Sequence, residues 1–175
     1  MKSIFLILLA SASSALAFDA DSFGHKLNGW QRDGSAHYSL NGNNYRSLKP
    51  LTTTAADGNT IVKVTVIHCP NSWAEVPLDL EVTYTPDGAA RDFRVSGSPK
   101  GQKVDSGVMT LAGNQEDPLA SVEAQLSQAS EAKDTRKRDL LARIAGPEPV
   151  NVAAIKEGLR YNLRLMVEAT AASGK

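Results

Sequence analysis

The chain has 175 residues, of which 42% are apolar and 22% are charged, with 19 basic side chains against 19 acidic ones. This composition is typical of one globular domain, or of one domain with an appendage, and excludes disordered, collagen-like and disulfide-stapled chains. Because the capture of phosphate groups needs a clear basic excess, the balanced charge also argues against nucleic acid as a partner. Cys69 is the single cysteine. No internal disulfide is therefore possible, and we expect the Cys69 thiol to be buried at the end of an apolar strand.

The first 17 residues have the pattern of a secretory signal peptide. Lys2 supplies a positive charge, residues 4–10 form an unbroken apolar run, and Ala15 and Ala17 provide a small-residue cleavage site. The apolar run is too short to cross a bilayer, which takes about 20 residues. We therefore expect cleavage after Ala17, a secreted or periplasmic location, and no membrane span in the processed chain.

Residues 18–113 form a segment in which β-branched and aromatic side chains alternate with polar ones, and this period of two predicts strands. Asn41-Gly42 and Pro86-Asp87-Gly88 are typical turn sequences, so each predicts a hairpin. Pro77 lacks an N–H group, so we expect its strand to begin there or to lie at an edge. Residues 52–56 are expected to form a loop. The expected strands are 36–40, 44–48, 60–69, 76–85, 91–95 and 108–111.

Residues 114–175 are rich in Ala, Leu, Glu, Lys and Arg and predict two helices. Asp117 can cap a helix over residues 118–145, and the Gly and Pro residues of 146–149 end it. A second helix is expected over residues 150–172 because its apolar side chains recur at helical spacing. The whole pattern predicts an α+β fold: a small, mostly antiparallel sheet of four to six strands, followed by a C-terminal two-helix hairpin that packs on the sheet or projects from it.

No arrangement of side chains predicts a reaction. His25, His37, His68 and Cys69 lack the spacing of metal ligands, since His68 and Cys69 are neighbours on one strand and point to opposite faces. Asp79 and Glu81 share a strand face, which is typical of a solvated surface as well as of paired catalytic acids. We therefore predict no catalytic residue, no metal and no cofactor.

Three aromatic residues are the candidates for contact with a partner. Trp30 and Trp73 fall in expected loops, and Tyr45 lies beside the Asn-rich turn, where exposed rings can stack on sugars or anchor a protein. The favoured interpretation is an exported, non-enzymatic binding or assembly module that contacts a protein or a polysaccharide through an edge strand, these aromatics or a charged helix. A small secreted hydrolase with catalytic acids scattered along the chain is an alternative, and a binder of a lipophilic ligand is another.

Overall fold

In the computed structural model, an antiparallel sheet is packed against one long helix, and the described residues are 17–71, 74–111, 117, 119–130 and 150–174. The sheet has eight strands in the order β1-β2-β4-β5-β6-β7, with β3 also paired to β4 and β8 also paired to β6. The elements are α1 (Ala20–Lys26), β1 (Ser35–Leu40), β2 (Asn43–Leu48), β3 (Leu51–Thr54), β4 (Thr60–Asn71), β5 (Ala74–Tyr84), β6 (Ala90–Gly97), the 3-10 turn η1 (Pro99–Gly101), β7 (Val104–Asp105), β8 (Met109–Thr110), α2 (Ala120–Ser130) and α4 (Val152–Ala172).

The strand count exceeds the expected four to six because both borders of the sheet are broken in the same way. Between the ladders that join β2 and β3 to β4, residues 48–50 face only Val64 and Thr65. Between the ladders that join β7 and β8 to β6, residues 106–108 likewise face only Arg94 and Val95. An extra residue in one strand is a bulge, which bends the strand and interrupts pairing. The sheet therefore has six strand positions, two of which are each divided into two short strands.

Both expected hairpins are confirmed. Asn41 and Gly42 have φ angles of 46° and 80°, which is the left-handed conformation that a two-residue hairpin turn requires. The β5–β6 hairpin turns through residues 85–89, where Gly88 has a φ angle of 85°. The strand expected at 108–111 is present as β8, whereas the loop expected at 52–56 is wrong, because residues 51–54 form β3.

The expectation for Pro77 is corrected by its position inside β5. This strand begins three residues earlier, at Ala74, and over most of its length it lies between β4 and β6. Pro77 pairs with Ile67 of β4, but pairing of β5 with β6 begins only at Asp79. The proline is tolerated because the strand is locally an edge on the β6 side at this point.

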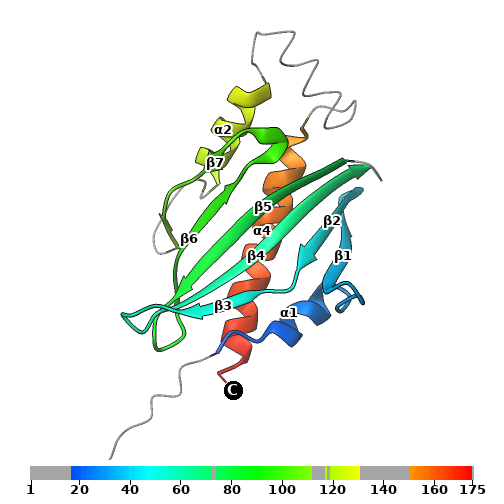
Figure 1. Ribbon diagram of the computed structural model, residues 1–175. Coiled ribbons are helices and arrows are strands. Elements are labelled where there is room, and N and C mark those ends of the chain that lie inside the picture. The colour runs from blue at the N-terminus through cyan, green and yellow to red at the C-terminus, as the bar shows by residue number, and fades with distance from the viewer. Residues whose placement is uncertain (1–16, 72–73, 112–116, 118, 131–149, 175) are drawn as a thin grey trace, which may run out of the picture.

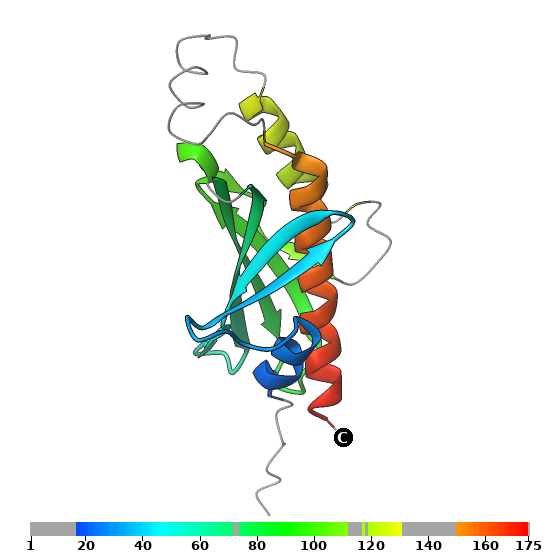
Figure 2. The ribbon, with the colours of Figure 1, turned by 90° about the vertical axis from the view of Figure 1, so that its right-hand side faces the viewer.

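Helix α4 covers one face of the curved sheet along its length, and Figures 1 and 2 show this arrangement from two sides. Asn151 caps the helix by accepting a hydrogen bond from the Ala154 N–H at 3.0 Å. The face turned to the sheet is buried together with the inner side chains of β4, β5 and β6, so the helix and the sheet share one core. The buried residues of α4 are Ala154, Ile155, Gly158, Leu159, Asn162, Leu163, Leu165, Met166, Ala169 and Thr170.

The C-terminal hairpin is seen in part. Helix α4 agrees with the expected helix over residues 150–172. Helix α2 occupies the first part of the helix expected over 118–145, and residues 131–149, which include the rest of that helix and its expected end, lie outside the described chain. Both helices pack on the fold rather than projecting from it, with Val122 and Leu126 of α2, and Leu119 just before it, buried in the shared core. In the described part of the chain, no helix combines the length and the apolar character needed to cross a membrane.

The N-terminal helix α1 was not expected from the sequence. Asp19 caps it by accepting hydrogen bonds from the N–H groups of Asp21 and Ser22, both at 3.1 Å. Phe23 and Leu27 are fully buried, and Lys26 of α1 forms an ion pair with Glu168 near the C-terminal end of α4. Residues 1–16, which contain most of the expected signal peptide, lie outside the described residues.

Candidate functional site

The borders of the sheet are where this fold exposes main-chain groups that can bind another chain. An edge strand presents a row of N–H and C=O groups, and natural proteins protect such rows with loops, charges, prolines or bulges. Three stretches of this border belong to β1, to β7 with β8, and to β3. They differ in what covers them.

The outer edge of β1 is covered by the loop that precedes it. The Gln31 N–H donates to the carbonyl oxygen of Ser35 at 2.5 Å, and the side-chain amide of Asn28 donates to the carbonyl oxygen of His37 at 3.5 Å. Both carbonyls belong to β1, so the loop takes the place that a further strand would occupy.

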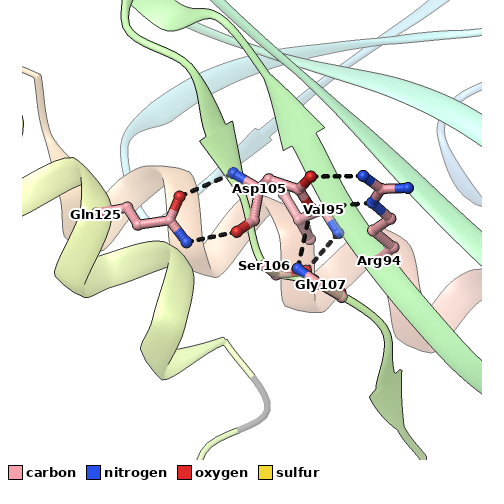
Figure 3. A network of polar contacts seen from close by, with 6 residues as sticks. All are labelled: Arg94, Val95, Asp105, Ser106, Gly107 and Gln125. Carbon is pink, nitrogen blue, oxygen red and sulfur yellow. Dashed lines mark hydrogen bonds and ion pairs between the residues drawn. The ribbon is translucent and has the colours of Figure 1, made fainter.

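The outer edge of β7 is closed by a side chain of α2, as Figure 3 shows. The Asp105 N–H donates to Oε1 of Gln125 at 2.8 Å, and Nε2 of Gln125 donates to the Asp105 carbonyl oxygen at 2.6 Å. A carboxamide carries a donor and an acceptor side by side, as a peptide group does, so Gln125 pairs with Asp105 much as a strand residue would. The Asp105 carboxylate is also held, because Arg94 donates to it and keeps its pKa low, at about 2.

The bulge between β7 and β8 is bonded to β6 through Ser106. Its N–H donates to the Val95 carbonyl oxygen at 2.8 Å, and its hydroxyl oxygen accepts from the Val95 N–H at 2.8 Å. The outer edge of β7 is therefore covered by a helix side chain, while Ser106 bonds the bulge to β6 on the inner side of this border.

Strand β3 is different, because all four of its residues are exposed and none is charged. Leu51 is 67% exposed, which is unusual for a large apolar side chain in a strand. The N–H of Ala55 donates to the Asn59 carbonyl oxygen at 2.8 Å, and antiparallel ladders alternate between bonded and non-bonded pairs. Thr54 and Thr52 are therefore non-bonded positions toward β4, and their N–H and C=O groups face away from the sheet. No described residue forms a hydrogen bond with these outward groups.

One end of this open edge is marked by Lys49 and Trp30. The exposed Lys49 ammonium lies 5.6 Å from the centroid of the Trp30 ring, within the range of a cation–π contact. Trp30 is half-buried and is held against α1, where its ring centroid is 6.0 Å from that of Phe23. A Cβ at Gly24 would approach the Trp30 ring to 2.4 Å, so glycine is required for this close packing. Among the described residues, no carboxylate forms an ion pair with Lys49.

The structure separates the three aromatic residues that the sequence suggested as partner contacts. Trp30 is half-buried and lies close to Lys49, which precedes the first residue of β3 by two positions. Tyr45 is only 1% exposed and lies inside β2, so a surface role for this ring is corrected. Trp73 lies outside the described residues.

Tyr45 is buried because α4 lies over it. Its hydroxyl donates to the Ala154 carbonyl oxygen at 2.7 Å, and its ring is stacked on Tyr38 with centroids 5.0 Å apart. Burial raises the pKa of Tyr45 to about 12. The ring of His68 lies 5.4 Å away and is 2% exposed, and no described residue forms a hydrogen bond with either ring nitrogen. Burial lowers the pKa of His68. These side chains build the core rather than a surface site.

Asp79, one of the two acids weighed for catalysis, is engaged in structural contacts. Asp79 forms an ion pair with Lys63 at 2.8 Å and accepts a hydrogen bond from the Thr65 hydroxyl at 2.7 Å. Cys69 is half-buried rather than fully buried, and burial raises the pKa of its thiol, which disfavours the nucleophilic thiolate. Within the described ranges, no three His, Cys, Asp or Glu side chains converge as metal ligands would.

A polar hollow of about 460 Å³ lies between the β1–β2 turn and the N-terminal end of α4. Lys156 pairs with Asp117 and Glu123, Arg160 pairs with Asp117 at 2.5 Å, and Glu157 accepts a hydrogen bond from Asn41. The Lys156 bond lowers the pKa of the Asp117 carboxyl to about 2. Both cations of the lining, Lys156 and Arg160, are therefore already paired with carboxylates. Its polar lining consists of Asn41, Asn43, Glu123, Asn151, Lys156, Glu157 and Arg160.

The sequence signal that could have located β3 is weak. Three consecutive threonines are β-branched and therefore favour a strand, but they give no alternation of apolar and polar residues. Comparison of the chain with protein-family models, with curated proteins and with solved structures found no match.

Proposed function

We propose that this chain is an exported binding or assembly module that holds an extended segment of a protein partner along β3. The observation that carries the proposal is the contrast between the borders: β1 and β7 are covered by their neighbours, whereas β3 presents the outward main chain of Thr52 and Thr54 to solvent. Addition of a strand to an open sheet edge is a common mode of peptide recognition, in which main-chain hydrogen bonds supply affinity. Export rests on the signal-peptide pattern of residues 1–17.

The side chains of β3 fit this role. An edge that must stay free of partners usually carries lysine, proline or an inward-pointing charge, and β3 carries none of these. Leu51 adds an exposed apolar side chain at one end of the strand, and Trp30 stands beside the residue that leads into it. Apolar and aromatic anchors surrounded by polar groups are the usual composition of a protein interface.

Replacement of Thr52 tests the proposal. Thr52→Pro removes one outward N–H without removing a hydrogen bond to β4, because Thr52 is a non-bonded position of that ladder. Thr52→Val keeps the N–H and nearly the same side-chain shape, so it is the matched control. Circular dichroism and thermal unfolding establish that both variants keep the fold.

The assay is a pull-down from the native extracellular or envelope fraction with the processed chain beginning at Phe18. A protein retained by the wild type and by Thr52→Val, but lost from Thr52→Pro, is the expected result. Equal retention by all three chains would place the contact elsewhere, and retention of a polysaccharide alone would favour the carbohydrate interpretation. A Trp30→Ala variant measures whether the ring beside Lys49 contributes to the same contact.

A further inference from the structure

The open edge beside β3 is short and is closed at one end. The Lys49 N–H donates to the Gly34 carbonyl oxygen at 3.0 Å, and Ser35 pairs with Leu48, so β1 takes over the border where β3 begins. The Gly34 N–H donates to the Gln31 carbonyl oxygen at 3.0 Å, which folds residues 31–34 into a turn at this point. A chain that runs along β3 toward Leu51 therefore meets this turn and has to end or leave the sheet.

The other end of the edge is open. After Thr54 the chain turns back through residues 55–59, and Ala56, Asp57 and Gly58 are exposed. A bound segment can leave the sheet past this turn into solvent. The site therefore accepts about four residues, the length of β3, and only one of its ends lets the bound chain continue.

The charge at the closed end is positive. Lys49 is exposed and pairs with no described carboxylate, while Lys63, which lies opposite Leu51 on β4, is already paired with Asp79. An antiparallel segment brings its carboxyl end to this place, and a parallel segment brings its amino end. A free carboxylate beside an ammonium group is favoured, whereas two ammonium groups repel each other.

We propose, resting on the function proposed above, that the occupant of β3 is the free carboxyl-terminal tail of a partner protein. The tail runs antiparallel to β3, its last residues pair with the outward main chain of Thr52 and Thr54, and its carboxylate lies at Lys49. Its side chains are uncharged, because those on one face lie beside Leu51 and Thr53, which favour β-branched and apolar neighbours across a strand pair.

A second copy of this chain fits the site less well. Its own β3 is an internal segment that continues into residues 55–59, and in an antiparallel pair that turn would meet the turn of residues 31–34. A pairing of two four-residue strands is also far smaller than the roughly 1,200–2,000 Å² that a stable interface buries. A chain end avoids the clash between the two turns, and its carboxylate adds an ionic contact with Lys49.

The test uses two pools of random acetylated hexapeptides that differ only at the last group, a free carboxylate or a carboxamide. Peptides enriched on the processed chain are resynthesised in both forms, and their affinities are measured by fluorescence polarisation. We expect the carboxylate form to bind about fivefold more tightly, the effect of one partly solvated ion pair. Lys49→Gln should remove this difference, Lys49→Arg should keep it, and the remote control Lys103→Gln should leave it unchanged.

Each outcome decides between the two proposals. Equal binding of acid and amide, with both forms lost in Thr52→Pro, would overturn the carboxyl-terminal proposal and support the edge. A preference for the acid that survives Lys49→Gln would also overturn the proposed role of Lys49. Enrichment of no peptide from either pool, or binding that Thr52→Pro does not affect, would overturn the edge function itself.

Discussion

Replacement of Gly158 by alanine tests how tightly α4 is packed on the sheet. A Cβ at this position would lie 2.5 Å from Cε1 and 2.7 Å from Cδ1 of Tyr45, whereas carbon atoms in contact are ordinarily 3.5–4.0 Å apart. The Tyr45 ring has to move by about 1 Å to relieve the overlap. The ring is held by its hydrogen bond to the Ala154 carbonyl and by the stacked ring of Tyr38, so a shift of the ring weakens both contacts.

Two opposing terms set the magnitude of the effect. In the interior of a helix, alanine is favoured over glycine by about 1 kcal/mol. Overpacking a rigid core costs about 1–3 kcal/mol, and loss of the Tyr45 hydrogen bond adds about 1 kcal/mol. We expect Gly158→Ala to lower the free energy of unfolding by about 2 kcal/mol, which corresponds to a fall in Tm of about 4–8 °C for a chain of this size.

The assay is urea unfolding followed by far-UV circular dichroism, with a double-mutant cycle through Tyr45→Leu. Leucine is shorter than the tyrosine ring, so in that background Gly158→Ala should be neutral or should stabilise the fold by up to about 1 kcal/mol. A Gly158→Ala single variant as stable as the wild type would refute the reasoning, because it would mean that α4 does not rest on the Tyr45 ring at the described distance.

Three further perturbations test other contacts. Burial lowers the pKa of His68 below 6.5, so the unfolded state binds the extra proton, and the free energy of unfolding should fall as pH drops through 6.5. Urea unfolding across this pH range should show that His68→Phe loses this part of the slope, and an identical slope in the variant would contradict the assignment. Gln125→Ala leaves the Asp105 main chain uncovered and should cost about 1–2 kcal/mol in urea unfolding, whereas a loss below 0.5 kcal/mol would show that the amide pairing is not stabilising. Lys156 lowers the pKa of Asp117 to about 2, so the ionised Asp117 stabilises the folded state fully above pH 3.8, and this stabilisation is lost as the pH falls to about 2. Thermal unfolding of Asp117→Asn should lack this acid-dependent fall in stability.

The sequence predicted the strands whose chemistry is local. Residues 76–85 alternate apolar and polar side chains, and Asn41-Gly42 supplies the left-handed φ angles of a tight turn, so both hairpins follow from short-range patterns. Strand β3 was missed because its threonines carry no alternation, and its strand conformation depends on pairing with β4. Tertiary contact, rather than local preference, determines this element.

The candidate site was predictable only in part for the same reason. Trp30 was selected as a loop aromatic, and the structure places it beside the entry to the open edge, although its packing on Gly24 could not be read from the sequence. Tyr45 was selected on the same ground and is buried, because α4 presents Gly158 to its ring from more than one hundred residues away. A periodic pattern shows which face of a strand is apolar, but it does not show which helix covers that face.

The dimensions of the open edge reconcile binding with resistance to self-association. A long, flat and uncharged edge strand is an aggregation hazard, and proteins shorten or bend such edges to avoid it. Here Pro50 and the bulge of residues 48–50 stop the edge on one side, and the turn of residues 55–59 ends it on the other, so only four residues stay available. Four residues offer the outward groups of two positions, too few for two copies to pair stably. A flexible tail avoids the steric conflict and adds a charged end, so the same short edge that disfavours self-pairing can select a chain terminus.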